Sequence, residues 1–186
     1  MEAPDDILNR AARIQLLITD CDGVLTDGGV YYSGQGEVLK KFNIRDGMGV
    51  ERLRKIAEVE TGIISGELSP AIRQRAEKLG IEECHLGVKN KGDVVKAIVS
   101  RRDVPLEAIA YIGDDVNYLE VFKLVGLCAC PGDALAEVRA QADYVCRLKG
   151  GEGAFREFAE VIVRSKNKGV SMMHGMSEPP KDPGCR

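Results

Sequence analysis

Two aspartates placed one residue apart are the feature of this sequence with the clearest chemical potential. The apolar run Leu16-Leu-Ile-Thr19 leads directly into Asp20 and Asp22, and Gly23 follows them. Near-continuous apolar runs are typical of buried parallel strands, and α/β proteins bind ligands just beyond the carboxyl ends of such strands. Two carboxylates this close need a cation or a shared proton. The segment therefore predicts a charged site at the mouth of a sheet, although a strand followed by an ordinary polar turn also fits this pattern.

Three further strand-like runs end in polar residues that suit the same site. In chain order, the residues that follow these runs are Ser65, Lys91 and the pair Asp114 and Asp115. A carboxylate can attack phosphorus and hold an aspartyl-phosphate, and Mg²⁺ prefers oxygen ligands from one or two carboxylates plus phosphate and water. Because phosphoryl transfer depends mostly on positioning and charge neutralisation, these residue types indicate phosphate chemistry.

The order of these motifs resembles the haloacid dehalogenase superfamily of phosphotransferases. The resemblance implies that Asp20 is the nucleophile, and that Asp22 first protonates the leaving oxygen and then activates water. It further implies that Mg²⁺ is held by Asp20, Asp114 and the backbone carbonyl of Asp22. Ser65 and Lys91 would hold the phosphoryl oxygens, and Lys91 would also offset the charge of the clustered carboxylates.

Asp115 and Asn117 are expected to orient the carboxylate cluster without touching the substrate. The superfamily often carries another aspartate one residue after Asn117, where this chain has Tyr118.

The elements that must position these residues alternate between strands and helices. Helices are expected over residues 47–58, 70–79, 92–101, 116–125, 134–140 and 155–164. Further short strands are expected at 127–130 and 144–146, and two β-rich runs at 30–32 and 38–42 predict a hairpin. Such alternation predicts an α/β fold, with a Rossmann-like parallel sheet and helices on both faces.

Two details of the helix ends matter for the site. Ser69 followed by Pro70 is typical of a helix start, and Gly80 of its end. The helix expected over 116–125 would place its N-terminus, where anions are favoured, beside the Asp114 and Asp115 pair.

The chain divides into an N-terminal extension (1–13), a phosphatase-like domain (14–164) and a C-terminal tail (165–186). The tail carries Gly, Ser, Met and Pro without periodicity. This composition predicts disorder, and the alternative is an arm that reaches the active site of another subunit.

Composition excludes several classes of function. A net charge of only -3 and an aromatic content of 5% without tryptophan argue against nucleic-acid binding. No apolar run approaches the length of a membrane helix, and the acidic N-terminus lacks a signal-peptide pattern. The cysteines mostly fall in apolar runs, so they are expected to be packing residues, including Cys21 between the aspartates, in a reducing cytoplasm.

The motif spacing leaves no room for a cap domain. Only a hairpin and one helix fit between Asp20 and Ser65, and only one helix between Ser65 and Lys91. A capless site is open to water, whereas this chemistry needs a closed site. A macromolecular substrate or a lid from a neighbouring subunit would close it.

The predicted hairpin favours a lid from a neighbouring subunit. The segments 28–33, 40–47 and 149–157 resemble the capless sugar-acid phosphatase group, which includes 3-deoxy-D-manno-octulosonate 8-phosphate and 2-keto-3-deoxynononate 9-phosphate phosphatases. That resemblance implies a homotetramer in which hairpins assemble the subunits and each active site is roofed by a neighbour.

The residues expected to read the sugar acid are Gly66, Glu67, Lys78, Asn43 and Arg45. Glu67 and Lys78 resemble the nononate branch, and Asn43 with Arg45 the octulosonate branch. The sequence thus favours the nononate 9-phosphate, with the octulosonate 8-phosphate of lipopolysaccharide synthesis as the alternative. For Glu67 and Lys78 themselves, the alternative is a place on a solvated helix face. A non-catalytic oligomerisation module of sialic-acid metabolism and a protein phosphatase remain as readings of other classes, although the full motif set favours an enzyme.

Overall fold

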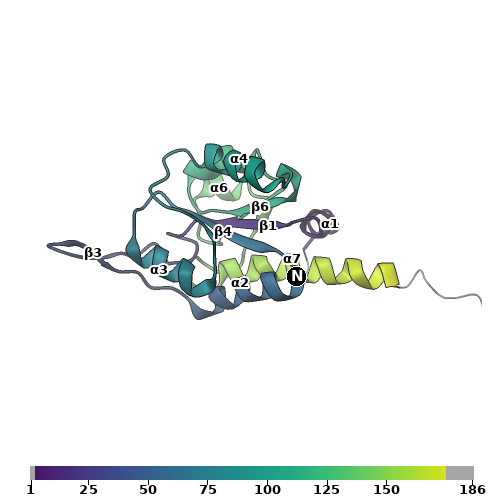
Figure 1. Ribbon diagram of the computed structural model, residues 1–186, viewed down its shortest axis with the longest axis horizontal. Helices are drawn as coiled ribbons and strands as arrows, with labels where there is room; N and C mark the ends of the chain where they lie inside the picture. Colours follow the sequence, from purple (N-terminus) through teal and green to yellow (C-terminus); the bar gives the residue numbers. More distant parts are fainter. Residues whose placement is uncertain (1–2, 175–186) are drawn as a thin grey trace, which may run out of the picture.

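A six-stranded parallel sheet forms the centre of the molecule, and the predicted α/β class is confirmed (Figure 1). The computed structural model describes residues 3–174, and the side chains of residues 3–167. The strand order is β5-β4-β1-β6-β7-β8. The strands are β1 (Leu16–Thr19), β4 (Glu60–Ile64), β5 (Glu83–His85), β6 (Ile109–Ile112), β7 (Leu127–Cys130) and β8 (Tyr144–Val145).

The chain order places a topological switch point between β1 and β6. From β1 the sheet grows outward through β4 to β5, and it then restarts on the other side of β1 with β6. Open α/β sheets bind ligands in the crevice outside the carboxyl ends of the strands at such a point. Asp20 directly follows β1 and Asp114 lies two residues after β6, so both candidate carboxylates lie at this crevice.

Helices cover both faces of the sheet (Figure 1). On one face lie α1 (Asp5–Ala11), α2 (Ile44–Ala57), α3 (Pro70–Leu79) and α7 (Ala154–His174). On the other lie α4 (Lys91–Arg102), α5 (Leu119–Phe122) and α6 (Ala136–Arg139), with the short 3-10 turns η1 (Leu106–Ala108) and η2 (Val116–Tyr118) between strands.

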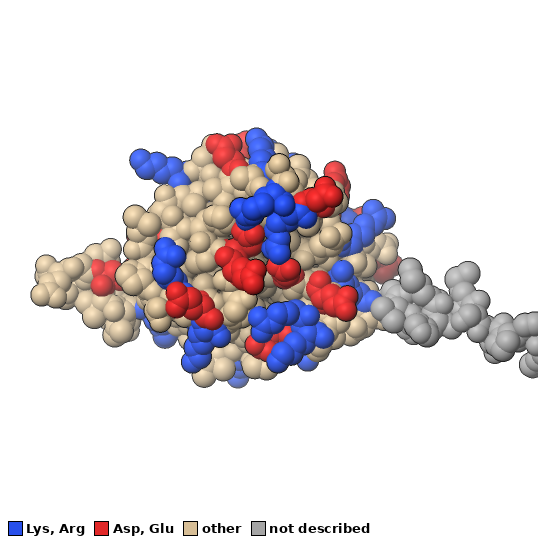
Figure 2. Space-filling view, in the orientation of Figure 1, with Lys and Arg blue, Asp and Glu red and all other residues tan. Residues whose placement is uncertain are grey.

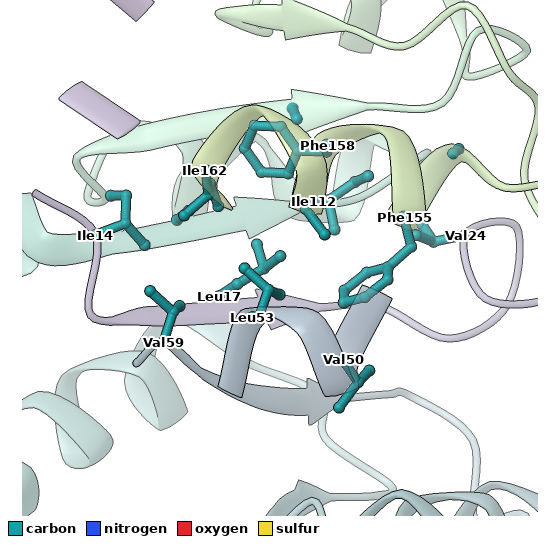
Figure 3. Close-up of a cluster of buried hydrophobic side chains, with 14 of the residues drawn as sticks. Ile14, Leu17, Val24, Val50, Leu53, Val59, Ile112, Phe155, Phe158 and Ile162 are labelled. Carbon is teal, nitrogen blue, oxygen red and sulfur yellow. The ribbon is translucent and has the colours of Figure 1, made fainter. Parts of the chain in front are cut away.

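The larger core lies between the sheet and the α2–α7 pair. Leu17 and Ile112 project from neighbouring strands toward Leu53 of α2 and Phe155 of α7 (Figure 3). The two helices approach closely at Gly49, where a β-carbon would lie 3.2 Å from the ring of Phe155. This packing fixes α2, and therefore the end of the hairpin that leads into it.

The helix predicted over 116–125 is wrong in its extent. The segment forms the 3-10 turn η2 and then only the four-residue helix α5. Asp115 accepts a hydrogen bond from the backbone N–H of Val116 at 2.6 Å, and the tight turn brings Tyr118 inward to 5.8 Å from the ring of Tyr111. A helix this short supplies little dipole, so the expected stabilisation of Asp114 by a helix N-terminus does not apply.

The predicted hairpin is confirmed as β2 (Tyr31–Ser33) and β3 (Gly36–Leu39), which project from the body of the molecule (Figure 1). Tyr31 and Tyr32 are 63% and 70% exposed, and Val38 and Leu39 are also exposed. On the face shown in Figure 2, acidic and basic side chains are interspersed over the body, whereas the projecting hairpin is mostly uncharged. Within residues 3–174, no helix is long and apolar enough to span a membrane.

Both ends of the described chain belong to the folded body. Helix α1 lies within the predicted N-terminal extension, yet Ile7 and Ala11 are buried in the larger core. Helix α7 packs on the core through Ile162 and Val163 and continues to His174, ten residues into the predicted tail. The rest of the predicted tail lies outside the described residues.

The cysteines pack as predicted. Cys21, Cys128, Cys130 and Cys146 are buried, and Cys84 is partly buried; these five thiols are free. Cys21 belongs to the larger core, so it serves packing rather than the chemistry of its aspartate neighbours.

Candidate active site

An ion pair between Asp20 and Lys91 lies at the centre of the crevice. Lys91 is the first residue of α4, and its Nζ lies 2.8 Å from Oδ1 of Asp20. The two residues are only 7% and 2% exposed, respectively. Burial raises the pKa of the Asp20 carboxyl, and the Lys91 ammonium opposes that rise. The structure thus brings together two residues that are 71 positions apart in the sequence.

Asp114 crowds the same site from the end of β6. Gly23 adopts a φ of +82°, and a β-carbon there would lie 1.9 Å from Oδ2 of Asp114. Only glycine therefore permits this approach of the Asp114 carboxylate to the loop after β1. Burial and the negative charge of Asp20 raise the pKa of Asp114 to about 7.

The crowded carboxylates fit a divalent cation bound through oxygen. Within the described residues, no group of three or more His, Cys, Asp or Glu side chains is arranged to hold a metal. Mg²⁺ does not need one, because it is usually bound by one or two carboxylates and completes its shell with water and phosphate. Burial raises the pKa of both carboxyls, and the charge of Asp20 raises that of Asp114 further, so a cation between the two would offset both effects.

Asp22, the predicted acid and base, has one oxygen held and the other free. Its Oδ1 accepts a hydrogen bond from Lys40 Nζ at 2.7 Å and a long one from Thr26 Oγ1 at 3.4 Å. Its Oδ2 is buried and has no hydrogen-bond partner in the described part of the protein. One oxygen thus anchors the side chain and leaves the other available for a proton.

Lys40 is a site residue that the sequence motifs do not include. It directly follows β3, and its side chain is completely inaccessible to solvent. Its ammonium also lies 3.1 Å from Oε2 of Glu37. The sequence holds a weak signal for it, since Lys40 opens one of the segments that resembles the sugar-acid phosphatases.

Ser65 lies at the end of β4, as predicted. It is buried, its backbone N–H donates to His85 O at 2.9 Å, and its Oγ accepts from the backbone N–H of Glu67 at 3.1 Å. Gly66 and Glu67 are exposed beside it. The hydroxyl is therefore fixed at the carboxyl edge of the sheet, with an exposed turn immediately after it.

Tyr118 contributes to the site although the sequence marked it only as a departure from the family pattern. Its ring centroid lies 4.0 Å from Lys91 Nζ, a cation–π contact that holds the ammonium toward Asp20. Burial and the charge of Asp20 raise the pKa of its phenol, which therefore stays protonated.

The remaining predicted residues lie around this centre or away from it. Asn43 caps α2 through its side chain and donates to Gly151 O at 3.0 Å, so both ends of its amide are used structurally. Arg45 lines a separate cavity of about 750 Å³ beside α7. Lys78 is exposed in the last turn of α3, at the opposite end from Ser65, and Asn117 is exposed in η2. Their expected contacts with substrate or with the carboxylates stay predictions.

Comparison with known proteins identifies the family of this chain. The sequence model of the haloacid dehalogenase-like hydrolases matches residues 69–157. The 3-deoxy-D-manno-octulosonate 8-phosphate phosphatase of Yersinia pestis is 39% identical over 164 residues, which are 88% of this chain and 87% of the relative. Its crystal structure superimposes with a TM-score of 0.85, covering 88% of each chain.

A second solved structure carries ligands. The phosphatase of the same name from Moraxella catarrhalis, solved with a magnesium ion, a phosphate ion and a KDO molecule, is 30% identical. It has a TM-score of 0.84 and covers 93% of this chain and 99% of that one.

The chain belongs to the haloacid dehalogenase superfamily of phosphotransferases and, within it, to the capless sugar-acid phosphatases. It is a phosphatase of the magnesium-dependent type, as the sequence predicted.

Proposed function

We propose that this phosphatase hydrolyses 3-deoxy-D-manno-octulosonate 8-phosphate. The observation that carries the proposal is the agreement of the relatives: proteins of this name from several bacteria match 83–88% of the chain at 36–39% identity. The sequence favoured the nononate 9-phosphate instead, and the comparisons support the octulosonate alternative better. Glu67, exposed directly after the Ser65 turn, is the residue that keeps the nononate as a second candidate.

In the proposed reaction, Asp20 attacks phosphorus and Asp22 protonates the sugar oxygen that leaves. Asp22 then takes a proton from water, whose oxygen attacks phosphorus and breaks the bond to Asp20, so that inorganic phosphate leaves and the Asp20 carboxylate is restored. Lys91 and Ser65 hold the phosphoryl oxygens, and the 2.8 Å contact of Lys91 with Asp20 favours the ionised form of that carboxylate. Asp20, Asp114 and the backbone carbonyl of Asp22 would hold Mg²⁺, which when bound neutralises the charge of the phosphate and the carboxylates.

The exposed hairpin supports a proposal about assembly. We infer a homotetramer in which hairpins pack between subunits and a neighbour covers each open site. Lys78, exposed in the last turn of α3, and Arg45, which lines the cavity beside α7, would contact the substrate of a neighbouring subunit across such an interface.

A panel of phosphate esters tests the proposed function. Phosphate release is measured with Mg²⁺ for the octulosonate 8-phosphate, the nononate 9-phosphate, common hexose phosphates and a phosphopeptide, with Asp20→Asn as the blank. The proposal expects the highest kcat/KM for the octulosonate ester. A clear preference for the nononate ester would reinstate the Glu67 interpretation. Preference for the phosphopeptide, or no activity on any ester, would reject a sugar-acid phosphatase.

A further inference from the structure

A chain of partly buried polar contacts links the hairpin to Asp22. Lys40 Nζ donates to Oδ1 of Asp22 at 2.7 Å and lies 3.1 Å from Oε2 of Glu37 on β3. The other oxygen of Glu37 accepts a hydrogen bond from the hydroxyl of Ser69, the residue before α3. The sequence predicted Ser69 as a helix cap, yet its side chain caps nothing and bonds to the hairpin instead.

Lys40 differs sharply from the lysine beside it. The side chain of Lys41 is 64% exposed and pairs with the exposed Asp27. The side chain of Lys40 is completely buried between two carboxylates. A buried ammonium is costly unless it is paired and hydrogen-bonded. The burial of Lys40 therefore depends on its contacts with Asp22 and Glu37.

We propose that Lys40 is the positioning residue of Asp22. The inference rests on the proposed function, in which Asp22 gives a proton to the leaving sugar oxygen. By holding Oδ1, Lys40 fixes the rotamer of Asp22 and leaves its unpartnered Oδ2 as the oxygen that carries the proton. Glu37 and Ser69 fix Lys40 in turn, so the seating of the hairpin on α3 sets the geometry of the acid.

Two substrates with different leaving groups distinguish a positioning role of Lys40 from a general effect on the structure. A sugar alkoxide is a poor leaving group and needs the proton from Asp22, whereas para-nitrophenolate leaves without one. The ratio kcat/KM reports only the steps up to phosphoryl transfer onto Asp20, so it isolates the proton-donating step.

The experiment measures kcat/KM of Lys40→Met with the preferred sugar phosphate and with para-nitrophenyl phosphate. A misplaced acid should lower the value for the sugar phosphate about 10- to 100-fold. The value for para-nitrophenyl phosphate should change by less than about threefold. Asp22→Asn should show the same selectivity, with a larger loss on the sugar phosphate than on para-nitrophenyl phosphate. The double variant should be no worse than Asp22→Asn, because the lysine acts through that carboxylate.

Lys41→Met is the matched control, and it should leave both values as in the wild type. Glu37→Gln is the second variant, used if thermal unfolding shows that Lys40→Met does not fold. It keeps Lys40 but removes the charge of one of its two partners. A smaller loss of kcat/KM, again selective for the sugar phosphate, is expected. Equal losses on both substrates, or no loss, in a folded Lys40→Met or Glu37→Gln protein would overturn the inference. A wild-type protein inactive on sugar phosphates, or an Asp22→Asn variant without leaving-group selectivity, would instead reject the proposed function.

Discussion

The site contains three carboxylates and only two lysines to neutralise them. Lys91 pairs with Asp20, and Lys40 pairs with Asp22. Asp114 has no ion pair among the described side chains, and its carboxyl has the pKa raised to about 7. This imbalance of charge marks the Asp114 side of the crevice as the place where a cation is needed. The three aspartates thus differ in their surroundings, because two are paired with a lysine and the third is not.

Replacing Asp20 by Asn tests the nucleophile. The amide keeps the size of the side chain but cannot attack phosphorus, so turnover should fall by at least about 10⁴-fold. The buried contact with Lys91 loses its charge, so folding is checked by circular dichroism and thermal unfolding. Appreciable turnover by a homogeneous, folded Asp20→Asn protein would contradict the assignment.

Removal of the metal tests the Asp114 side of the crevice. Excess chelator should abolish phosphate release and Mg²⁺ should restore it, because two buried carboxylates and a phosphate then lack a neutralising cation. Ca²⁺ should bind yet support little turnover, since its larger and more flexible coordination misplaces the reacting groups. Full activity in excess chelator would exclude this site.

At the scale of elements, the α2–α7 contact contains a buried acid of its own. Asp46, in the first turn of α2, accepts a hydrogen bond from the backbone N–H of Arg156 on α7 at 2.9 Å. Its second oxygen is buried without a partner in the described structure. Burial raises the pKa of Asp46 to about 6, although Arg75 and Arg156 oppose the rise.

This raised pKa predicts a loss of stability as pH increases. Between about pH 4 and pH 6 the unfolded chain has already lost the Asp46 proton while the folded chain keeps it, so unfolding becomes easier. Asp46→Asn keeps an oxygen for the Arg156 N–H and cannot ionise. The variant should therefore gain stability relative to wild type as pH rises from 4.5 to 7, by at most about 3 kcal/mol. Urea unfolding of both proteins at the two pH values measures this gain, and a constant difference would contradict the prediction.

The sequence predicted the helices and strands well where the hydrophobic periodicity agrees with the residues that begin and end a helix. Helix α3 begins at Pro70 and ends before Gly80, as expected. The helix expected after Asp115 is mostly absent, because the burial of Tyr118 under Lys91 needs a tighter turn than an α-helix gives. Tertiary packing of that kind leaves no local pattern in the sequence.

In the candidate site, too, some residues can be located from local sequence patterns and others only from the tertiary structure. Asp20, Ser65, Lys91 and Asp114 each follow a strand, so parallel topology alone brings them to one edge. Lys40 follows an exposed hairpin, and only the three-dimensional path of that insertion brings its ammonium to Asp22. A contact made by a side chain arriving from an insertion depends on the path of that insertion, which motif order does not describe.

At the scale of the whole molecule, the open site and the exposed hairpin are structurally linked. An isolated two-stranded hairpin is marginal in water, and this one exposes large apolar side chains along both strands. The same hairpin carries Glu37 and leads directly into Lys40, which contacts Asp22. Burial of the hairpin between subunits would therefore stabilise the acid as well as cover the site.

Replacing Tyr31 and Tyr32 by Asp tests this link. Charges on the hairpin should disfavour its burial, so the tetramer should dissociate and kcat/KM for the sugar phosphate should fall with it. Light scattering and phosphate release are measured on the same samples over a dilution series, since activity should follow the fraction of tetramer. Ile56→Asp, on an exposed position near the end of α2, is the control and should keep both properties. A wild-type monomer with full activity at nanomolar concentration would show that the hairpin is not needed for assembly or for catalysis.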